Sequence, residues 1–248
     1  MKIHVPIIAF NGNVHTEFMF SMMALQQHFI KNNYQATFYP ITFESLISRA
    51  RNAAAADFLA GDSDYMFFVD TDMTFTPDDF ELLIKQNKEI CVGAYPKKYL
   101  NSGKLQYISK NVNDQKVIDN IEKYSTDFSS EINYSKKLVE ECIEVGYAAT
   151  GFMLIKRSAL LNIIEKFPNI EYKNDIDGYG LDKNKFYNFF QVGITSEKKY
   201  LSEDYGFCEL HKLSGGKLHC VTNTNLTHIG RKFYEGNLYE QSILWNKL

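Results

Sequence analysis

The feature that most constrains the fold is an unbroken apolar run, Tyr65–Val69, that ends directly in Asp70-Thr71-Asp72. A strand with one face in water alternates apolar and polar residues, whereas a strand covered on both faces is apolar throughout. The run therefore predicts a strand buried inside a sheet that carries helices on both sides. Charged side chains at its end mark the point where the strand leaves the core.

Strand-like and helix-like segments alternate around this run. Short apolar runs rich in β-branched and aromatic residues predict strands, and apolar residues at helical spacing predict helices. The strands are expected at Ile3–Ala9, Gln35–Ile41, Tyr65–Val69 and Ile90–Ala94, and later at Phe152–Ile155 and Leu218–Thr222. The helices are expected at Glu17–Ile30, Ser45–Leu59, from Pro77 onward, at Ser158–Phe167 and at Glu203–Leu213. This alternation predicts an α/β fold with a mixed, mostly parallel central sheet flanked by helices.

The segment 97–142 differs from the rest because it is rich in Asn, Ser, Lys and Asp and poor in apolar residues. We interpret it as a polar surface insertion with short elements. A chain of 248 residues suits one sizeable domain. The expected organisation is a single domain, 1–248, in which residues 1–96 and 143–248 flank the insertion.

Composition narrows the functional classes. With 27 basic and 30 acidic residues, the formal net charge of −3 gives no basic excess for nucleic-acid binding. The four cysteines are far apart in sequence, which fits reduced thiols better than a zinc ribbon or a disulfide framework. No apolar stretch is long enough to cross a bilayer and no signal peptide is evident, so we expect a cytoplasmic protein.

The acidic pair Asp70 and Asp72 predicts a metal site. Side chains two apart on a strand point to the same side, and the carboxyl ends of strands in open α/β sheets are where ligands bind. Two converging carboxylates repel each other unless a cation or hydrogen-bond donors neutralise them. Mn²⁺ or Mg²⁺ is the expected cation, and it could hold a diphosphate. The alternative is that both residues begin a polar loop and cap backbone groups.

The order of several short motifs resembles the GT-A glycosyltransferases that contain an Asp-x-Asp motif, of the family 2 type. The segments that carry the resemblance are Ser48–Asn52, Phe58-Leu59, Tyr65–Asp72, Phe75–Pro77, Gly151–Ile155, Ser202–Phe207 and Thr227–Gly230. The resemblance implies a Rossmann-type nucleotide-binding fold. It also implies a nucleotide-sugar-binding half at 1–96, with the acceptor side and the completion of the metal site at 143–248.

The resemblance also implies roles for individual residues. Asp72 is the expected principal metal ligand, Asp70 contacts the ribose, the metal or both, and His228 is a further ligand. Asp204 is the expected catalytic base of an inverting transferase, with Glu203 second. Arg51, Asn52 and Gly151 complete the expected nucleotide-sugar site.

Each of these residues also has a structural interpretation. Arg51 suits a solvated helix position, Gly151 a turn, and His228 an ordinary core or surface histidine. The acidic pair Glu203-Asp204 also suits a helix start, because the positive end of the helix dipole favours carboxylates.

The expected function is a metal-dependent glycosyltransferase that moves a sugar from a nucleotide diphosphate sugar, a UDP-sugar first, to a hydroxyl of a glycan or other acceptor. A retaining mechanism stays open. Two alternatives remain. One is a sugar-phosphate nucleotidyltransferase, although Phe10–Asn13 lacks the glycine-rich basic loop of that class. The other is a non-catalytic nucleotide- or carbohydrate-binding module.

Overall fold

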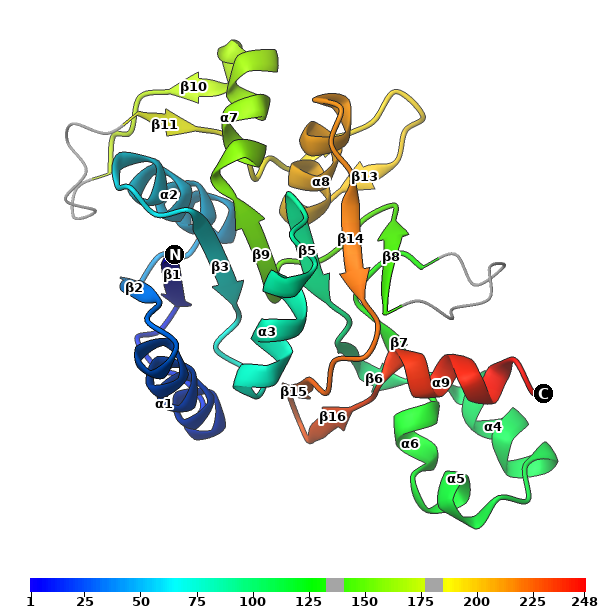
Figure 1. Cartoon of the computed structure of the whole chain (residues 1–248). Helices are drawn as coiled ribbons and strands as arrows, with labels where there is room; N and C mark the ends of the chain where they lie inside the picture. The colour runs from blue at the N-terminus through cyan, green and yellow to red at the C-terminus, as the bar shows by residue number, and fades with distance from the viewer. Residues whose placement is uncertain (133–140, 177–184) are drawn as a thin grey trace.

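The computed structural model describes residues 1–132, 141–176 and 185–248. Its first part alternates strand and helix as the hydrophobic pattern predicts (Figure 1). The elements are β1 (Lys2–Ala9), α1 (Thr16–Lys31), β2 (Gln35–Thr42), α2 (Ile47–Ala60), β3 (Tyr65–Val69), β4 (Met73–Thr74), α3 (Pro77–Lys85) and β5 (Ile90–Gly93). The expected strand at Tyr65–Val69 is confirmed at both ends, and α2 begins two residues later than expected.

The central sheet has seven strands in the order β2-β1-β3-β9-β5-β14-β8. The later strands are β8 (Cys142–Val145), β9 (Phe152–Lys156) and β14 (Leu218–Val221). Strands β1, β2, β3, β5 and β14 run in one direction, while β9 lies antiparallel between β3 and β5, and β8 lies antiparallel at the edge. The predicted fold class, a mixed and mostly parallel sheet, is confirmed.

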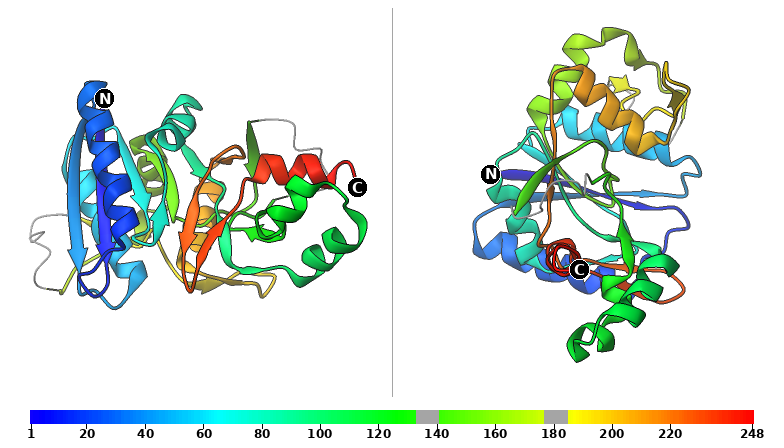
Figure 2. Two further views of the ribbon diagram at one scale, coloured as in Figure 1. Left: turned by 90° about the horizontal axis from the view of Figure 1, so that it is seen from below. Right: turned by 90° about the vertical axis from the view of Figure 1, so that its right-hand side faces the viewer.

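The apolar run in β3 supplies both faces of the sheet. Phe67 and Val69 pack with the helices α1 and α3 on one face. Met66 and Phe68 pack on the other face with α2, α7 (Arg157–Lys166) and α8 (Glu203–Leu213). Figure 2 shows the sheet between these two helical layers. Successive side chains of a strand point to opposite faces, which is why no polar residue interrupts the run.

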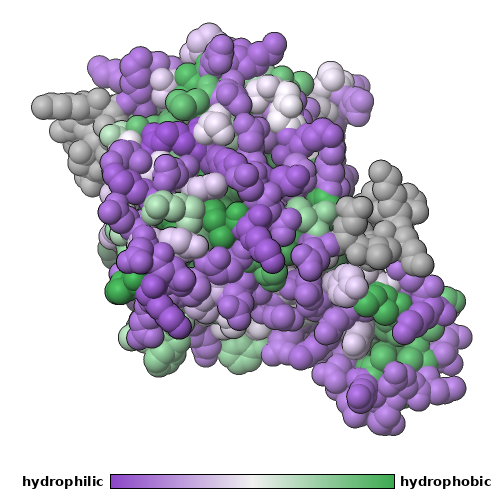
Figure 3. All heavy atoms as spheres, in the orientation of Figure 1, coloured by the Kyte–Doolittle hydropathy of each residue, from purple (hydrophilic) through white to green (hydrophobic). Residues whose placement is uncertain are grey.

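The polar segment forms short elements to one side of the sheet (Figure 1). These are β6 (Pro96–Leu100), α4 (Ser102–Asn111), α5 (Gln115–Asp119), α6 (Ile121–Tyr124) and β7 (Thr126–Phe128). They share a small apolar cluster with α9 (Leu238–Trp245), built on the buried Ile108, Val112 and Val117. Figure 3 shows apolar atoms at the surface of this unit, on a face that is otherwise mostly polar.

The remaining elements join the layers. They are the 3₁₀ turn η1 (Pro168–Ile170) and the strands β10 (Glu171–Tyr172), β11 (Phe186–Tyr187), β12 (Gly193–Ile194), β13 (Tyr200–Leu201), β15 (Thr227–Ile229) and β16 (Phe233–Glu235). A small sheet in the order β16-β15-β4 places β15 beside the residues that follow β3. In the described part of the chain, no helix is both long and apolar enough to cross a membrane.

Candidate active site

A cavity of about 340 Å³ lies at the edge where β1, β2 and β3 end. Because β1 pairs with β2 on one side and with β3 on the other, the chain changes direction across the sheet here, which is where open α/β sheets bind ligands. The residues that line the cavity are Ile8, Phe10, Glu44, Ser45, Ile47, Arg51, Asp70, Thr71 and Asp72. Three of the expected site residues, Arg51, Asp70 and Asp72, therefore share one concave surface.

Asp72 and His228 are brought together by the small sheet. β15 pairs with β4 so that His228 stands opposite Met73, and the Ile229 amide donates to the Asp72 carbonyl at 2.7 Å. The His228 Nδ1 lies 2.9 Å from the Pro96 carbonyl oxygen, which can only accept, so we assign the ring hydrogen to Nδ1. In the neutral ring Nε2 then carries a lone pair, and it lies 3.6 Å from Asp72 Oδ1.

Asp72 is a strongly acidic carboxyl. Burial alone would raise its pKa, but a protonated His228 ring and the Lys98 ammonium lower the pKa to about 2. Lys98 pairs with Oδ2. Oδ1 is buried and has no hydrogen-bond partner among the described residues. One oxygen is thus neutralised and the other is left open toward the His228 imidazole.

This donor set fits Mn²⁺ or Mg²⁺. A buried carboxylate oxygen that no described residue hydrogen-bonds and, in the neutral ring, an imidazole lone pair face each other, and both are ordinary ligands of such ions. No group of three or more His, Cys, Asp or Glu side chains within the described ranges is arranged to hold a metal. A hard divalent ion with two protein ligands usually completes its shell with substrate phosphate oxygens and water.

Asp70 lies on the other side of the cavity floor, where its side chain is 41% exposed. Its Oδ1 lies 3.5 Å from the Arg51 guanidinium, and its amide donates to the Gly151 carbonyl at 3.1 Å. Loss of surrounding water raises the pKa of Asp70, Arg51 opposes this rise, and the charge of Asp72 adds to it. The side chain is open to the cavity yet surrounded by protein atoms. Metal ligation by Asp70 stays a prediction.

Gly151 leaves room for two neighbours. A Cβ atom at this position would lie 2.5 Å from the Tyr95 hydroxyl and 3.0 Å from Asp70 Oδ2. The Gly151 amide donates to that hydroxyl at 3.2 Å, and the Tyr95 ring packs edge-on against His228 with a centroid distance of 5.3 Å. Tyr95 thus links the glycine to the histidine. Sequence reasoning missed this residue, although it directly follows the apolar strand expected at Ile90–Ala94.

Arg51 connects three elements at the back of the site. It lies on α2, it is 5% exposed, and its guanidinium contacts both Asp70 after β3 and Glu203 at the start of α8. The interpretation of Arg51 as a solvated helix residue is therefore wrong. Glu203 is held in an ion pair inside the fold.

The two carboxylate oxygens of Asp204 differ in their hydrogen bonds to the described residues. Its Oδ1 accepts hydrogen bonds from the Tyr205 amide, at 2.8 Å, and from the Ser202 hydroxyl, so it caps α8. No hydrogen bond among the described residues uses Oδ2. The Asp204 charge contributes to raising the pKa of Asp70 and of Tyr95, so the carboxylate lies in the same electrostatic environment as the acidic edge.

Asn52 faces away from solvent and holds a loop. Its amide donates to Asn188 Oδ1 at 3.0 Å, and its oxygen accepts from the Phe190 amide at 2.9 Å. Both polar groups of this side chain are engaged within the protein. Contact with a nucleotide stays a prediction for this residue.

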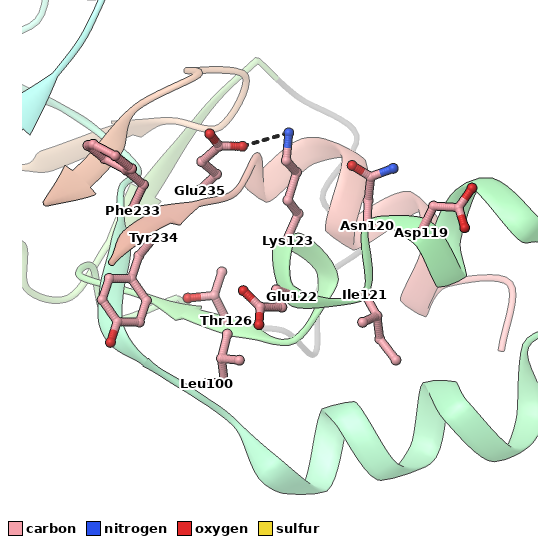
Figure 4. Close-up of a pocket in the computed structure, with 10 residues that line it drawn as sticks. All are labelled: Leu100, Asp119, Asn120, Ile121, Glu122, Lys123, Thr126, Phe233, Tyr234 and Glu235. Atoms are coloured by element: carbon pink, nitrogen blue, oxygen red, sulfur yellow. Dashed lines mark ion pairs between the residues drawn. The ribbon is translucent and has the colours of Figure 1, made fainter. Parts of the chain in front are cut away.

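A second cavity, of about 230 Å³, lies between the polar segment and β16 (Figure 4). Its wall includes Phe233, Tyr234 and Glu235 from β16, and Glu122 and Lys123 from α6. Leu100, Asp119, Asn120, Ile121 and Thr126 complete the lining. The Lys123 ammonium pairs with Glu235 across this cavity at 2.7 Å.

Comparison with solved structures supports the fold. No family model and no curated protein matches the chain. The protein A197 from STIV superposes with a TM-score of 0.50 at 16% identity, over 96% of this chain and 95% of that one. GalNAc-T7, in a structure with UDP, GalNAc and Mn²⁺, gives a TM-score of 0.49 at 11% identity over 93% of this chain and 43% of that one. The chain thus shares its fold with A197 over nearly the whole length of both chains.

Proposed function

We propose that this protein is a metal-dependent glycosyltransferase that moves a sugar from a nucleotide diphosphate sugar, a UDP-sugar first, to a hydroxyl of a glycan or other acceptor. One observation carries the proposal. At the edge of the central sheet where its parallel strands end, a buried Asp72 oxygen with no hydrogen-bond partner among the described residues lies 3.6 Å from His228 Nε2. Asp72 also lines the cavity of about 340 Å³, which is large enough for part of a nucleotide.

On this proposal Asp72 and His228 hold Mn²⁺ or Mg²⁺. The ion, when bound, stabilises the negative charge that grows on the departing diphosphate. The chain supplies the rest of the donor site. Asp70, kept in place by Arg51 and by the Gly151 carbonyl, faces the ribose or the ion, and the cavity walls hold the nucleoside.

Asp204 is the proposed general base. An inverting transferase needs a carboxylate that takes the proton of the attacking hydroxyl. The capping bonds of Asp204 use Oδ1 only, so Oδ2 can accept that proton without loss of the helix cap. Glu203 is the weaker candidate because its carboxylate is paired with Arg51.

The acceptor side is proposed at the polar segment and β16. The second cavity combines the aromatic side chains Phe233 and Tyr234 with carboxylates and an amide (Figure 4). Aromatic faces pack against sugar rings, and carboxylates accept hydrogen bonds from sugar hydroxyls. This combination supports a carbohydrate acceptor.

Thermal unfolding with nucleotides tests the donor site. UDP, GDP, ADP and CMP are each added with and without Mn²⁺ to the wild type and to Asp72→Ala. A ligand at a hundred times its Kd adds about 2.7 kcal/mol of stability, a rise of roughly 5–10 °C for a chain of this length. We expect this rise with UDP, only in the presence of Mn²⁺, and only in the wild type.

Two outcomes would overturn the proposal. Absence of a shift with every nucleotide would show that the acidic edge does not bind a donor. A shift that survives in Asp72→Ala would remove the assigned metal ligand.

A further inference from the structure

The Lys98 ammonium lies beside Asp72, where the proposed metal ion would bind. It belongs to β6, which packs against β15 and β16, and its ammonium pairs with Asp72 Oδ2. The stem of the side chain passes over Gly230, where an added Cβ would lie 3.1 Å from Lys98 Cδ and 3.2 Å from the Tyr234 ring. The absence of a side chain at Gly230 thus leaves space for the stem of Lys98.

The two oxygens of Asp72 serve different partners. Oδ2 is paired with the ammonium, whereas Oδ1 is buried, lacks a hydrogen-bond partner among the described residues and faces His228 Nε2. The ammonium therefore neutralises the carboxylate that the proposed function assigns to the metal. A divalent ion on the same carboxylate would be repelled by an ammonium this close.

The side chain of Lys98 is able to move away from Asp72. It is 39% exposed, and lysine carries its charge on a flexible four-carbon stem. A diphosphate bound at this edge would bring new negative charge and a new partner for the ammonium. Before a diphosphate arrives, Asp72 is the acidic partner that the structure gives it.

We propose that Lys98 is the resident counter-ion of Asp72. It competes with the divalent ion in the free protein and moves to the diphosphate when the nucleotide binds. Metal binding and nucleotide binding are thereby coupled, and the metal is held weakly until the nucleotide is present. This inference rests on the proposed function, and it assigns Lys98 as a positioning residue that controls the cation site.

The test measures Mn²⁺ binding from the electron paramagnetic resonance signal of free Mn²⁺, with and without UDP. The variant is Lys98→Met. Its matched control is Lys97→Met, because Lys97 is the exposed neighbour on the same strand and its loss changes the net charge equally. Adjacent strand residues point to opposite faces, so only Lys98→Met removes the contact with Asp72.

Without UDP, we expect Lys98→Met to bind Mn²⁺ about tenfold more tightly than the wild type and Lys97→Met, because a competing charge is removed. The factor by which UDP strengthens Mn²⁺ binding should be about tenfold smaller in Lys98→Met. Lys98→Arg keeps the charge and should stay within about twofold of the wild type on the same competition argument.

Equal Mn²⁺ affinities for Lys98→Met and Lys97→Met would overturn the inference, and so would weaker binding by Lys98→Met without UDP. Neither outcome would touch the proposed function if Asp72→Ala abolishes binding. Mn²⁺ binding that persists in Asp72→Ala would instead overturn the site assignment itself. Should Lys98→Met fail to fold, Lys98→Gln, which is also uncharged, replaces it in the same comparison.

Discussion

At the residue scale, the site depends on a glycine, which has no side chain, and on a carboxylate oxygen that has no hydrogen-bond partner among the described residues. Gly151 has no side chain, and the Tyr95 hydroxyl and the Asp70 carboxylate occupy the space that a Cβ would fill. Asp72 Oδ1 has no hydrogen-bond partner within 3.5 Å among the described residues, and it lies 3.6 Å from His228 Nε2. Gly151 therefore lets Tyr95 and Asp70 approach the backbone closely, and Asp72 keeps an oxygen to which no described residue is hydrogen-bonded.

Gly151→Ala is expected to damage this edge. The new Cβ would lie 2.5 Å from the Tyr95 hydroxyl, and Tyr95 is buried against His228, so the site must shift. We expect a loss of about 1–3 kcal/mol in the free energy of unfolding. The stabilisation by UDP with Mn²⁺ should also be lost, and thermal unfolding measures both. Gly193→Ala is the control, because no described residue other than its chain neighbours lies within 4 Å of the added Cβ. Equal behaviour of the two variants would contradict the close-approach argument.

His4 makes stability depend on pH. Its ring is 4% exposed in β1, and burial, followed by the charge of Arg157, lowers its pKa to about 4. Below pH 6.5 the His4 ring takes up a proton in the unfolded chain, whereas in the folded protein it stays neutral until the pH approaches 4. The contribution of the neutral His4 ring to the free energy of unfolding is therefore fully present above pH 6.5 and is lost as the pH falls toward 4. The full loss is about 3 kcal/mol.

Urea unfolding at pH 7 and at pH 4.5 measures this dependence. His4→Gln should flatten the decrease in stability, whereas replacing the exposed His15 by Gln should leave it unchanged. An equally steep decrease in His4→Gln would show that other groups cause it.

At the scale of elements, the start of α8 meets α2 and the end of β3. Arg51 ties these elements together through Asp70 and Glu203, while Asp204 caps its own helix with one oxygen. Adjacent acidic residues thus have separate tasks. The helix dipole explains why both are tolerated there, and the tertiary contacts decide what each one does.

Asp204→Asn and Glu203→Gln separate these tasks. Asparagine retains the oxygen that caps α8, so Asp204→Asn should keep its stability and UDP binding while sugar transfer falls by about 10²–10⁴. Glu203→Gln keeps an acceptor for Arg51 but loses the charge. It should cost about 1–3 kcal/mol of stability and leave the transfer rate within about tenfold of the wild type. Steady-state kinetics and thermal unfolding measure both effects. The reverse pattern of rates would make Glu203 the base.

At the scale of the whole molecule, the described residues form two large apolar cores on the faces of the sheet and one small cluster under α4 and α9. The small cluster is built on Ile108, Val112 and Val117 and is covered by Trp245, the single tryptophan of the chain. Because a small core stabilises its elements less, this unit should open at lower free energy than the sheet.

Trp245 reports on that opening. Its ring packs against Tyr107 with a centroid distance of 5.4 Å, so its fluorescence follows the small unit, whereas far-UV circular dichroism follows mainly the large layers. In urea, we expect the fluorescence transition to precede the dichroism transition. Coincident transitions would show that the molecule unfolds as one unit. Trp245→Phe should leave the dichroism midpoint nearly unchanged.

The strands and helices that surround the acidic edge could be predicted from local patterns, because apolar periodicity acts within a few residues. Tyr65–Val69 could be assigned to both faces of a sheet, and Asp70 and Asp72 to its carboxyl end, from the local pattern alone. The start of α3 at Pro77 could also be predicted from neighbouring residues, and in the structure Thr76 and Asp79 form its capping box.

The distant residues that complete the site are set by long-range strand pairing, which no local pattern predicts. β9 enters between β3 and β5 and sets Gly151 beside Asp70, and β15 pairs with β4 and sets His228 beside Asp72. Nothing in the sequence distinguishes Lys98 from Lys97, yet only Lys98 pairs with Asp72. These contacts form when segments far apart in the sequence come together and their side chains pack, so local sequence patterns do not predict them.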